Sequence, residues 1–412
     1  MTCNFVSKFL LIFLSVGTRV QALEGLADLE AKLFSQNQEY QSLQLQNEAS
    51  QSLLGSTRSG YYPTLNAVGG YGQNKTDDLS VAEKGYLGYI EGRVNLFRGF
   101  KDQAAKNLRT NQINLVKNEL ETRKRDLRLQ LVSVASDMIL LHKFETILAE
   151  EYKTTQLQKQ MAAKKVSAGL TSQVDKIEFE LRESELLIEQ KQFSQQHEEA
   201  HQKFNALLGS EVAESEFAKL DFSPSEKSAL VVQNITVENT LEYKKAQLIQ
   251  LQAEFEKSEI KSEFLPSVDF TFSAGRLTPS EMTPLQFNES KYALLLTVPL
   301  FSGFDTYYKT RAATQTLQAA ERLKNQSRSD TYATIATAKA KMSELISLSQ
   351  INEKRLLSSQ KYFDLTLSEY KRGVKNSPDL VGATERLFSS RKKRYEILKD
   401  LELLKVRLET FN

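Results

Sequence analysis

The sequence predicts a mainly helical protein built from two copies of one repeat, each joining a pair of short strands to a very long antiparallel helical hairpin. Three observations predict this fold: short motifs recur at a fixed offset, four short runs alternate apolar and polar residues, and stretches without Gly or Pro carry apolar heptads. The chain has 412 residues but only 17 Gly, 7 Pro and no Trp, a composition that suits long helices better than a compact α/β enzyme.

The chain begins with the features of a secretory signal peptide. Lys8 precedes an apolar run from Phe9 to Val16, and Val20 and Ala22 stand where small residues precede a cleavage site. We expect cleavage after Ala22, so that residues 1–22 are the signal peptide. A membrane anchor is the competing interpretation, but the apolar run is too short to cross about 30 Å of hydrocarbon as a helix.

Cysteine content and charge exclude several classes of function. Cys3, the one cysteine, lies inside the signal, so we expect no disulfide in the mature chain. Cleavage also removes Lys8 and Arg19 and no acidic residue, which lowers Lys plus Arg from 54 to 52 against 52 Asp plus Glu. A net charge of zero argues against a nucleic-acid partner. The sequence contains no Gly-rich phosphate loop, Ser/His/Asp set or CxxC pair, so we expect neither an enzyme nor a cofactor.

A tandem duplication organises the chain. YYPTLNA at 61–67 recurs as FLPSVDF at 264–270, and VNLFRGF at 94–100 recurs as VPLFSGF at 298–304. Gly169 in SAGLTSQVD corresponds to Gly373 in KRGVKNSPD, an offset of 204 residues. These anchors predict a first repeat at 23–208, a linker at 209–235 and a second repeat at 236–412. The linker is expected to pack around the middle of the long helices, and we assign it no function.

Each repeat begins with a helix that gives way to extended chain at a proline. Helices are expected at about 24–58 and 236–261, before Pro63 and Pro266, because proline disfavours the helical conformation of the preceding residue. Strands are expected at about 64–73 and 86–97 in the first repeat and 267–275 and 291–300 in the second. Apolar and polar residues alternate strictly in SVDFTFSA at 267–274.

The strand pairs fit two environments. One is an amphipathic hairpin on a soluble core, and the other is a transmembrane hairpin, since about 10 tilted residues cross an outer membrane. Aromatic residues gather at both ends of the runs, with Tyr62 and Phe301 at one end and Tyr71 and Tyr292 at the other. Aromatic girdles of this kind are typical of membrane strands.

A very long helix follows each strand pair. Residues 101–166 contain no Pro and no Gly, and at about 1.5 Å per residue such a helix is roughly 100 Å long. Both long helices are expected to end at the Gly of the repeat, where a returning helix begins, so each repeat carries an antiparallel hairpin. The apolar heptad positions are Leu127, Leu131, Val134, Met138, Leu141, Leu148 and Tyr152 in the first helix and Ile335, Met342, Leu356, Phe363 and Tyr370 in the second.

Four strands in one chain cannot close a barrel, and lipid does not tolerate the open edges of an isolated sheet. If the strands lie in a membrane, several chains must therefore combine. Three chains would give twelve strands, with the polar strand faces around a water-filled lumen. The helices would then extend the cylinder far beyond the membrane.

These features together resemble the TolC-like outer membrane efflux proteins. The resemblance covers nearly all of the mature chain and rests on the duplicated halves, the Pro at each helix-to-strand junction, the VNLFRGF and VPLFSGF strand ends, and the SAGLTSQVD and KRGVKNSPD turns. The first repeat departs from the pattern in carrying Asn95 where the second has Pro299.

The resemblance implies a homotrimer with a 12-stranded β-barrel in the lipid of the outer membrane and an α-helical tunnel across the periplasm. A periplasmic adaptor would deliver substrates from an inner-membrane transporter, and drug efflux, metal efflux and type I secretion of proteins all remain open. A periplasmic coiled-coil scaffold or adaptor without a membrane barrel is the alternative, and it predicts extraction without detergent.

The family's site residues are carried over at the turns and just after them. Asp379 corresponds to the first inward carboxylate that narrows the family's tunnel, although an Asp in the first turn of a helix is also stabilised by the helix dipole. Gly382 stands where the family would place a second Asp, so we expect one ring of carboxylates. The resemblance implies adaptor contact at Ala168, Gly169, Leu170 and Thr171 and at Arg372, Gly373, Val374 and Lys375.

The segment HEEAH at 197–201 matches the H-E-x-x-H pattern of zinc metalloproteases, in which two His bind the metal and the Glu acts as general base. His197 also belongs to an apolar series on the returning helix, which favours a seam residue of a coiled coil. Leu401 and Lys405 stand at the two His positions in the second repeat, and the other histidine, His142, lies far upstream. We therefore expect no metal site and disfavour a zinc hydrolase.

Overall fold

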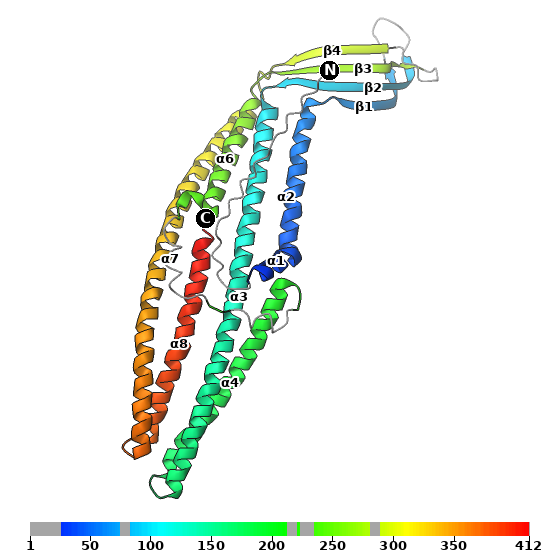
Figure 1. Ribbon diagram of the computed structural model, residues 1–412. Coiled ribbons are helices and arrows are strands. Elements are labelled where there is room, and N and C mark those ends of the chain that lie inside the picture. Colours follow the sequence, from blue (N-terminus) through cyan, green and yellow to red (C-terminus); the bar gives the residue numbers. More distant parts are fainter. Residues whose placement is uncertain (1–25, 75–82, 212–220, 223–234, 281–288, 412) are drawn as a thin grey trace, which may run out of the picture.

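The computed structural model describes residues 26–74, 83–211, 221–222, 235–280 and 289–411. The molecule is elongated, with a four-stranded sheet at one end, two tight turns at the other and long helices between them (Figure 1). The expected signal peptide at 1–22 and most of the linker at 209–235 lie outside the described residues.

The first repeat begins with two helices instead of the single helix expected at 24–58. Asn37 leaves the helical conformation, and its side chain accepts a hydrogen bond from the backbone N–H of Tyr40 at 3.0 Å. This N-cap starts a separate helix. The elements are α1 (Leu26–Gln36), α2 (Gln38–Thr57), β1 (Thr64–Asn74), β2 (Glu83–Arg98), α3 (Lys101–Ser167) and α4 (Gln173–Leu208).

The second repeat follows the same plan. Its first helix begins at Leu241, later than the expected 236, because Thr240 caps it by accepting from the N–H of Tyr243 at 3.4 Å. The elements are η3 (Val237–Asn239), α6 (Leu241–Ser262), β3 (Ser267–Ser280), β4 (Glu289–Thr297), α7 (Asp305–Arg372) and α8 (Ser377–Glu409).

The helical hairpins of the two repeats begin at equivalent residues. Phe100 and Phe304, 204 positions apart, precede α3 and α7, and both have positive φ, at 64° and 66°. The two helices contain 67 and 68 residues, which corresponds to about 100 Å at 1.5 Å per residue. The duplicated plan of long antiparallel hairpins plus four strands is therefore confirmed.

The four strands form one antiparallel sheet in the order β1-β2-β3-β4. β2 begins three residues before the expected 86 and β3 continues to Ser280, whereas β4 stops three residues before the expected 300. Thr297 of β4 pairs with Ser267, the first residue of β3 after Pro266, and Pro299 has no N–H to continue the ladder.

A glycine gives the sheet room for an aromatic ring. Gly92 of β2 pairs with Phe272 of β3, and a Cβ added at Gly92 would lie 2.2 Å from Cε1 of that ring. The phenyl ring therefore covers the backbone of the neighbouring strand, an arrangement that pins the register of the two strands.

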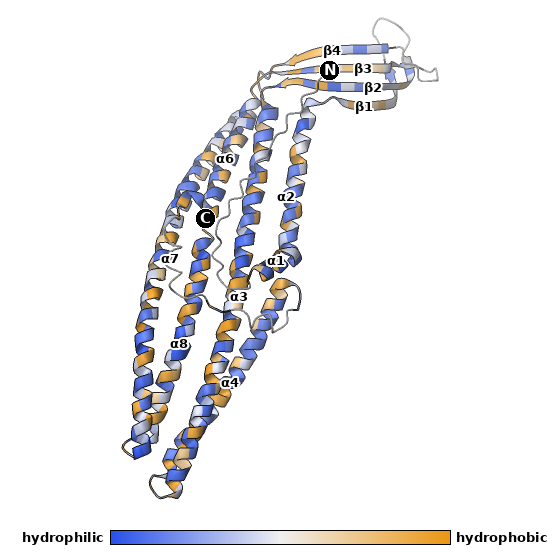
Figure 2. Cartoon of the chain, viewed as in Figure 1, coloured by the Kyte–Doolittle hydropathy of each residue, from blue (hydrophilic) through white to orange (hydrophobic). Residues whose placement is uncertain are grey.

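The packed interior follows the helices and is not gathered in one centre. The largest cluster joins α1, α2, α3, α4 and α8 and includes Leu33, Leu131, Phe204 and Val406. Apolar residues recur among polar ones along all of the long helices (Figure 2). Of the heptad residues, Leu127, Leu131, Met138, Leu148, Ile335, Met342 and Tyr370 are buried, and Val134, Leu141, Tyr152, Leu356 and Phe363 are partly buried.

In the half of the molecule that carries the turns, the helices lie in the order α7, α8, α3, α4 (Figure 1). Nearer the sheet, α6 packs between α7 and α3, and α2 packs against α3. α7 and α4 are thus the outer helices of this row, although Tyr370 of α7 and Phe179 of α4 contact each other just above the turns. Within the described part of the chain, no helix has both the length and the apolar character needed to span a membrane.

Candidate functional site

The sheet has a mainly polar face, which also carries the exposed Leu295 of β4, and an apolar face. On the polar face Nη2 of Arg93 donates to Oδ2 of Asp269 at 2.7 Å, and the Asp269 side chain is buried. Exposed apolar side chains from all four strands share the other face: Leu65, Ile90, Phe270, Tyr292, Leu294 and Leu296. A contiguous apolar surface of this kind is disfavoured in water and fits a hydrophobic partner.

The two turns, which we call the tips, have the same backbone geometry. Gly169 and Gly373 are left-handed, with φ of 69° and 83°. The N–H groups of Leu170 and Val374 each donate to the carbonyl five positions earlier, at 2.9 and 3.0 Å, which satisfies the end of the preceding helix. Of the eight residues expected at the tips, Thr171 is half-buried and the others are exposed: Ala168, Gly169, Leu170, Arg372, Gly373, Val374 and Lys375.

Asp379 lies in the first turn of α8, close to the second tip. Asn376 caps this helix by accepting from the N–H of Asp379 at 3.2 Å, and Nζ of Lys375 lies 3.7 Å from Oδ2 of Asp379. Gly382 follows one turn later, with no atom within 4 Å of where its Cβ would stand. The carboxylate is therefore half-exposed near the tip, beside a cation that offsets part of its charge.

An aromatic cluster joins the two hairpins just above the tips. Tyr370 of α7 and Phe179 of α4 pack edge to face with ring centroids 5.9 Å apart, and Nζ of Lys165 lies 4.0 Å from the centre of the Tyr370 ring. Lys165 also donates to the backbone carbonyl of Tyr370, and the N–H of Ser377 donates to Oδ1 of Asp175 at 3.4 Å. Burial raises the pKa of the Tyr370 hydroxyl.

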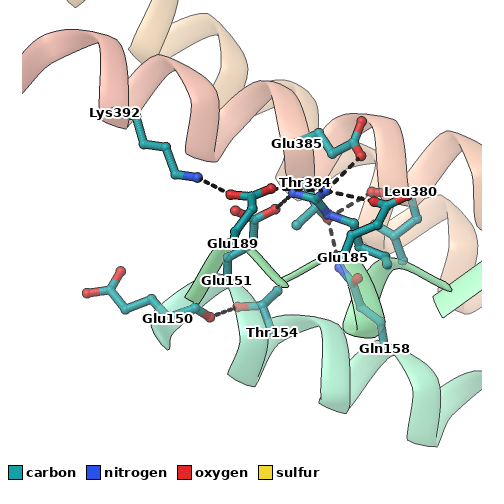
Figure 3. A network of polar contacts seen from close by, with 11 residues as sticks. Glu150, Glu151, Thr154, Gln158, Glu185, Glu189, Leu380, Thr384, Glu385 and Lys392 are labelled. Carbon is teal, nitrogen blue, oxygen red and sulfur yellow. Dashed lines mark hydrogen bonds and ion pairs between the residues drawn. The ribbon is translucent and has the colours of Figure 1, made fainter. Parts of the chain in front are cut away.

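A charge network around Arg182 of α4, which we call the Arg182 network, lies farther from the tips than the aromatic cluster. Figure 3 shows its contacts from close by. Arg182 of α4 donates to Glu151 of α3 at 2.5 Å and to Glu185 at 3.0 Å, and it lies 3.4 Å from Glu385 of α8. Lys392 of α8 donates to Glu189 of α4 at 2.7 Å. Gln158 and Thr384 add a buried hydrogen bond of 2.9 Å between α3 and α8. The network therefore ties three helices from both repeats together.

The charges of the Arg182 network depend on one another. Burial raises the pKa of Glu151, whose side chain is 1% exposed, and the bond from Arg182 opposes that rise. Burial would lower the pKa of the Arg182 guanidinium, but its bonds to Glu151 and Glu185 outweigh this effect and hold the pKa above its ordinary value. Each charge of the buried pair offsets part of the desolvation of the other, so removing one partner alone leaves an uncompensated buried charge.

A second buried pair lies near the C-terminal end of α8. Nζ of Lys405 is 3.8 Å from Oε1 of Glu402, and both side chains are almost fully buried. Neither of these two atoms forms a hydrogen bond to any described residue. Burial raises the pKa of Glu402 to about 7, although Lys405 opposes the rise.

The zinc motif does not assemble into a metal site. His197, Glu198 and His201 lie on α4, where Glu198 accepts from Gln202 at 3.0 Å and His201 lies 3.3 Å from the Asn205 amide. Among the described residues, no group of three or more His, Cys, Asp or Glu side chains is placed to hold a metal ion. Glu198 and His201 therefore contact side chains of their own helix.

The sequence comparison with family models finds a match in the second repeat. Residues 238–410 match the family model described as "Outer membrane efflux protein". The resemblance drawn from the sequence is thus confirmed, and outer membrane efflux proteins are channels rather than enzymes. No curated protein matches the chain.

Solved structures of outer membrane proteins and channels share the fold over both repeats. The outer membrane protein VceC of Vibrio cholerae has a TM-score of 0.81 at 11% identity, covering 94% of this chain and 96% of that one. The open-state MtrE outer membrane channel of Neisseria gonorrhoeae has a TM-score of 0.78 at 16% identity, covering 94% and 89%. The Campylobacter jejuni CmeC outer membrane channel has a TM-score of 0.73 at 11% identity, covering 95% and 87%.

The sequence reasoning missed the Arg182 network and the Glu402–Lys405 pair. Arg182 is one of many charged residues on α4, and its partners on α3 and α8 lie 31 and 203 positions away. The heptads carry a weak signal for buried polar contacts. Glu151, Gln158 and Lys405 are polar residues on the packed faces of α3 and α8, where most of the large buried residues are apolar.

Proposed function

We propose that the chain is the protomer of a homotrimeric outer-membrane channel, a passive exit route for small molecules or proteins. The observation that carries this proposal is the sheet, which exposes an apolar face and leaves the outer edges of β1 and β4 unpaired by any described strand. Open edges are not tolerated in lipid, so the strands of one chain need those of other chains to close a barrel. Three chains would supply twelve strands.

The long hairpins would extend the channel as a periplasmic tunnel. α3 and α7 both run from the sheet to the tips, about 100 Å at 1.5 Å per residue. We propose that cleavage of residues 1–22 accompanies export of the chain, and that the mature protein consists of the repeats at 23–208 and 236–412 and the segment between them.

The tips are the proposed contact with a periplasmic adaptor, which would receive substrate from an inner-membrane transporter. Leu170 and Val374 project from the two turns with 76% and 69% of their surface exposed. Apolar side chains at the ends of rigid hairpins offer a partner contact area at little cost in ordering the chain. Arg372 and Lys375 add positive charge beside the second turn.

Asp379 is the proposed constriction. In a trimer its carboxylate would occur three times around the tunnel near the tips, and a ring of carboxylates favours cations. Lys375 lies close enough to reduce that preference. The proposal is one ring, because Gly382 supplies no second carboxylate.

The decisive experiment measures the detergent-corrected mass of the protein extracted from isolated outer membranes, followed by single-channel recording of the same sample. We expect three copies per particle and discrete conductance steps. Release from the membrane by salt buffer alone, as a monomer or dimer, would overturn the channel and favour a coiled-coil scaffold.

A further inference from the structure

A cavity of about 790 Å³ lies at mid-length of the molecule, where two helices approach each other end to end. α6 and α8 both pack between α3 and α7, with α6 on the side of the sheet and α8 on the side of the tips (Figure 1). α6 begins at Leu241 and α8 ends at Glu409, so neither helix fills the space between their ends. Residues from all four helices line the cavity.

Apolar side chains form one part of the cavity wall. Leu129 of α3 and Leu403 of α8 are partly buried, and Phe411, which follows α8, is 7% exposed. Leu323 of α7 also lines the cavity and is 64% exposed, so it has apolar surface left for a partner. Small-molecule sites commonly have volumes of about 300–1,000 Å³ and mostly apolar walls with a few polar groups. The cavity therefore suits an organic molecule with an apolar body.

The charged groups of the cavity wall favour a positively charged ligand. Three carboxylates and two guanidinium groups line the cavity, a net charge of −1, and they belong to Asp126, Glu242, Asp330, Arg125 and Arg407. Arg125 donates to Glu242, and its Nη2 lies 3.0 Å from Oδ1 of Asp126, so one cation is shared by two acids. The Arg125 side chain is 17% exposed, which leaves its guanidinium little surface for a ligand. The excess negative charge attracts a cation.

Asp330 of α7 is the carboxylate best placed to meet such a cation. Its side chain is exposed, and the Gln326 amide donates to its Oδ1 at 2.7 Å. A neutral donor of this kind leaves the carboxylate its full negative charge. Ser327 donates to the backbone carbonyl of Glu242 at 3.4 Å and so joins α7 to the start of α6 at the cavity. The exposed carboxylate and the apolar wall therefore belong to one cavity.

We propose that this cavity binds a hydrophobic organic cation, an amine or quaternary ammonium ion with an apolar body. The cationic group lies beside Asp330, and the apolar body lies against Leu129, Leu403 and Phe411. Removing the apolar body from water supplies most of the affinity, and the carboxylate selects the sign of the ligand's charge. One chain supplies every residue of the site, so binding does not require the proposed trimer.

A single tryptophan beside the cavity reports binding directly. The natural chain contains no Trp, so Leu323→Trp gives the intact protein one reporter. Two ligands carry the same dansyl fluorophore, one with a quaternary ammonium group and the other with a carboxylate. We expect saturable energy transfer from the tryptophan to the cationic ligand. The affinity for the cationic ligand should exceed that for the anionic one about threefold or more, as expected for one partly exposed ionic contact.

Substitutions in the reporter protein test the carboxylate and the volume separately. Asp330→Asn should weaken binding of the cationic ligand about threefold or more and reduce the difference between the two ligands. The matched control is Asp364→Asn, because Asp364 is also exposed on α7 and accepts from Gln360 at 3.0 Å, but lies outside the cavity. This control should leave both affinities unchanged. Thr334→Phe places a ring in the cavity and should weaken binding of both ligands.

A second reporter separates the cavity from the detergent around the protein. Leu357→Trp places the tryptophan at an exposed site of α7, about 40 Å from Asp330 at 1.5 Å per residue, and should show no saturable transfer. Equal affinities for the two ligands, unchanged binding in Asp330→Asn, or equal transfer from both reporters would overturn the cation site. Particle mass is measured on the same samples. A monomer that binds the cationic ligand would support the site and overturn the proposed function.

Discussion

Arg182 of α4 donates a 2.5 Å hydrogen bond to Glu151 of α3, a carboxylate whose side chain is 1% exposed. The contact joins the two arms of the first hairpin at a level where Glu385 of α8 also reaches the guanidinium. One cation thus holds an acid from each of two other helices, and a buried charge of this kind is costly when its partner is removed.

We predict that Arg182→Ala lowers the free energy of unfolding by about 3 kcal/mol, because Glu151 is left buried without its counter-charge. Adding Glu151→Gln to that variant should recover part of the loss. The control is Arg328→Ala, since the pair of Arg328 with Glu238 is exposed and should change stability by about 0.5 kcal/mol or less. Denaturant unfolding followed by circular dichroism measures all three, and equal losses for Arg182→Ala and Arg328→Ala would contradict the prediction.

Glu402 predicts a pH dependence of stability. Its pKa is raised by burial from 4.5 to about 7, so the folded chain binds this proton more tightly than the unfolded chain. The contribution is fully present below about pH 4.5 and is lost as pH rises through about 7, with a total of about 3 kcal/mol for a shift of this size.

Glu402→Gln should therefore remove a decline in stability between about pH 4.5 and 7 that the natural chain shows. The control is Glu254→Gln, because Glu254 is exposed on α6 and its replacement should leave the decline unchanged. Unfolding midpoints across this pH range measure the effect. Parallel profiles for the natural chain and Glu402→Gln would refute the assignment.

The close contact of Gly92 with the Phe272 ring predicts that a side chain at position 92 destabilises the sheet. Gly92→Ala should destabilise the sheet by about 1–3 kcal/mol, because the new Cβ would lie 2.2 Å from the Phe272 ring and must displace it. Gly69→Ala on β1 is the control, since no atom lies within 4 Å of its added Cβ. The heat resistance of the folded species on gels reports the difference, and a loss no greater than that of Gly69→Ala would argue against a rigid ring.

The fold could be predicted from the sequence because the features that determine it are either local or present in both repeats. Proline before the strands, heptads without Gly or Pro, and the 204-residue offset between Gly169 and Gly373 each constrain a long element. The helix break at Asn37 could not be predicted, because Asn37 lies among other polar residues and nothing in the sequence distinguishes a capping Asn from them. The partners of Arg182 and Glu402 could not be predicted, since which charges become buried depends on how α8 lies against α3 and α4.

The exposed apolar residues at the tips predict a partner contact. Leu170→Asp and Val374→Asp together should weaken binding of a purified periplasmic adaptor about tenfold or more, because each replaces apolar contact area by a charge that must be desolvated. Leu45→Asp on α2 introduces the same charge at an exposed site far from the tips and serves as the control. Surface binding assays measure the affinities, and equal affinity for the double variant and the control would remove the tips from the interface.

Asp379 predicts the ion preference of the proposed channel. Asp379→Asn should lower the preference for cations about twofold or more, since three carboxylates leave the constriction at once. Lys375→Ala should act in the opposite direction, because Nζ of Lys375 lies 3.7 Å from Oδ2 of Asp379 and offsets its charge. Reversal potentials in a salt gradient measure both variants, and the opposite signs separate an electrostatic ring from a general loosening of the tip. If Asp379→Asn leaves both the reversal potential and cation block unchanged, the carboxylate serves α8 only as a first-turn residue that is stabilised by the helix dipole.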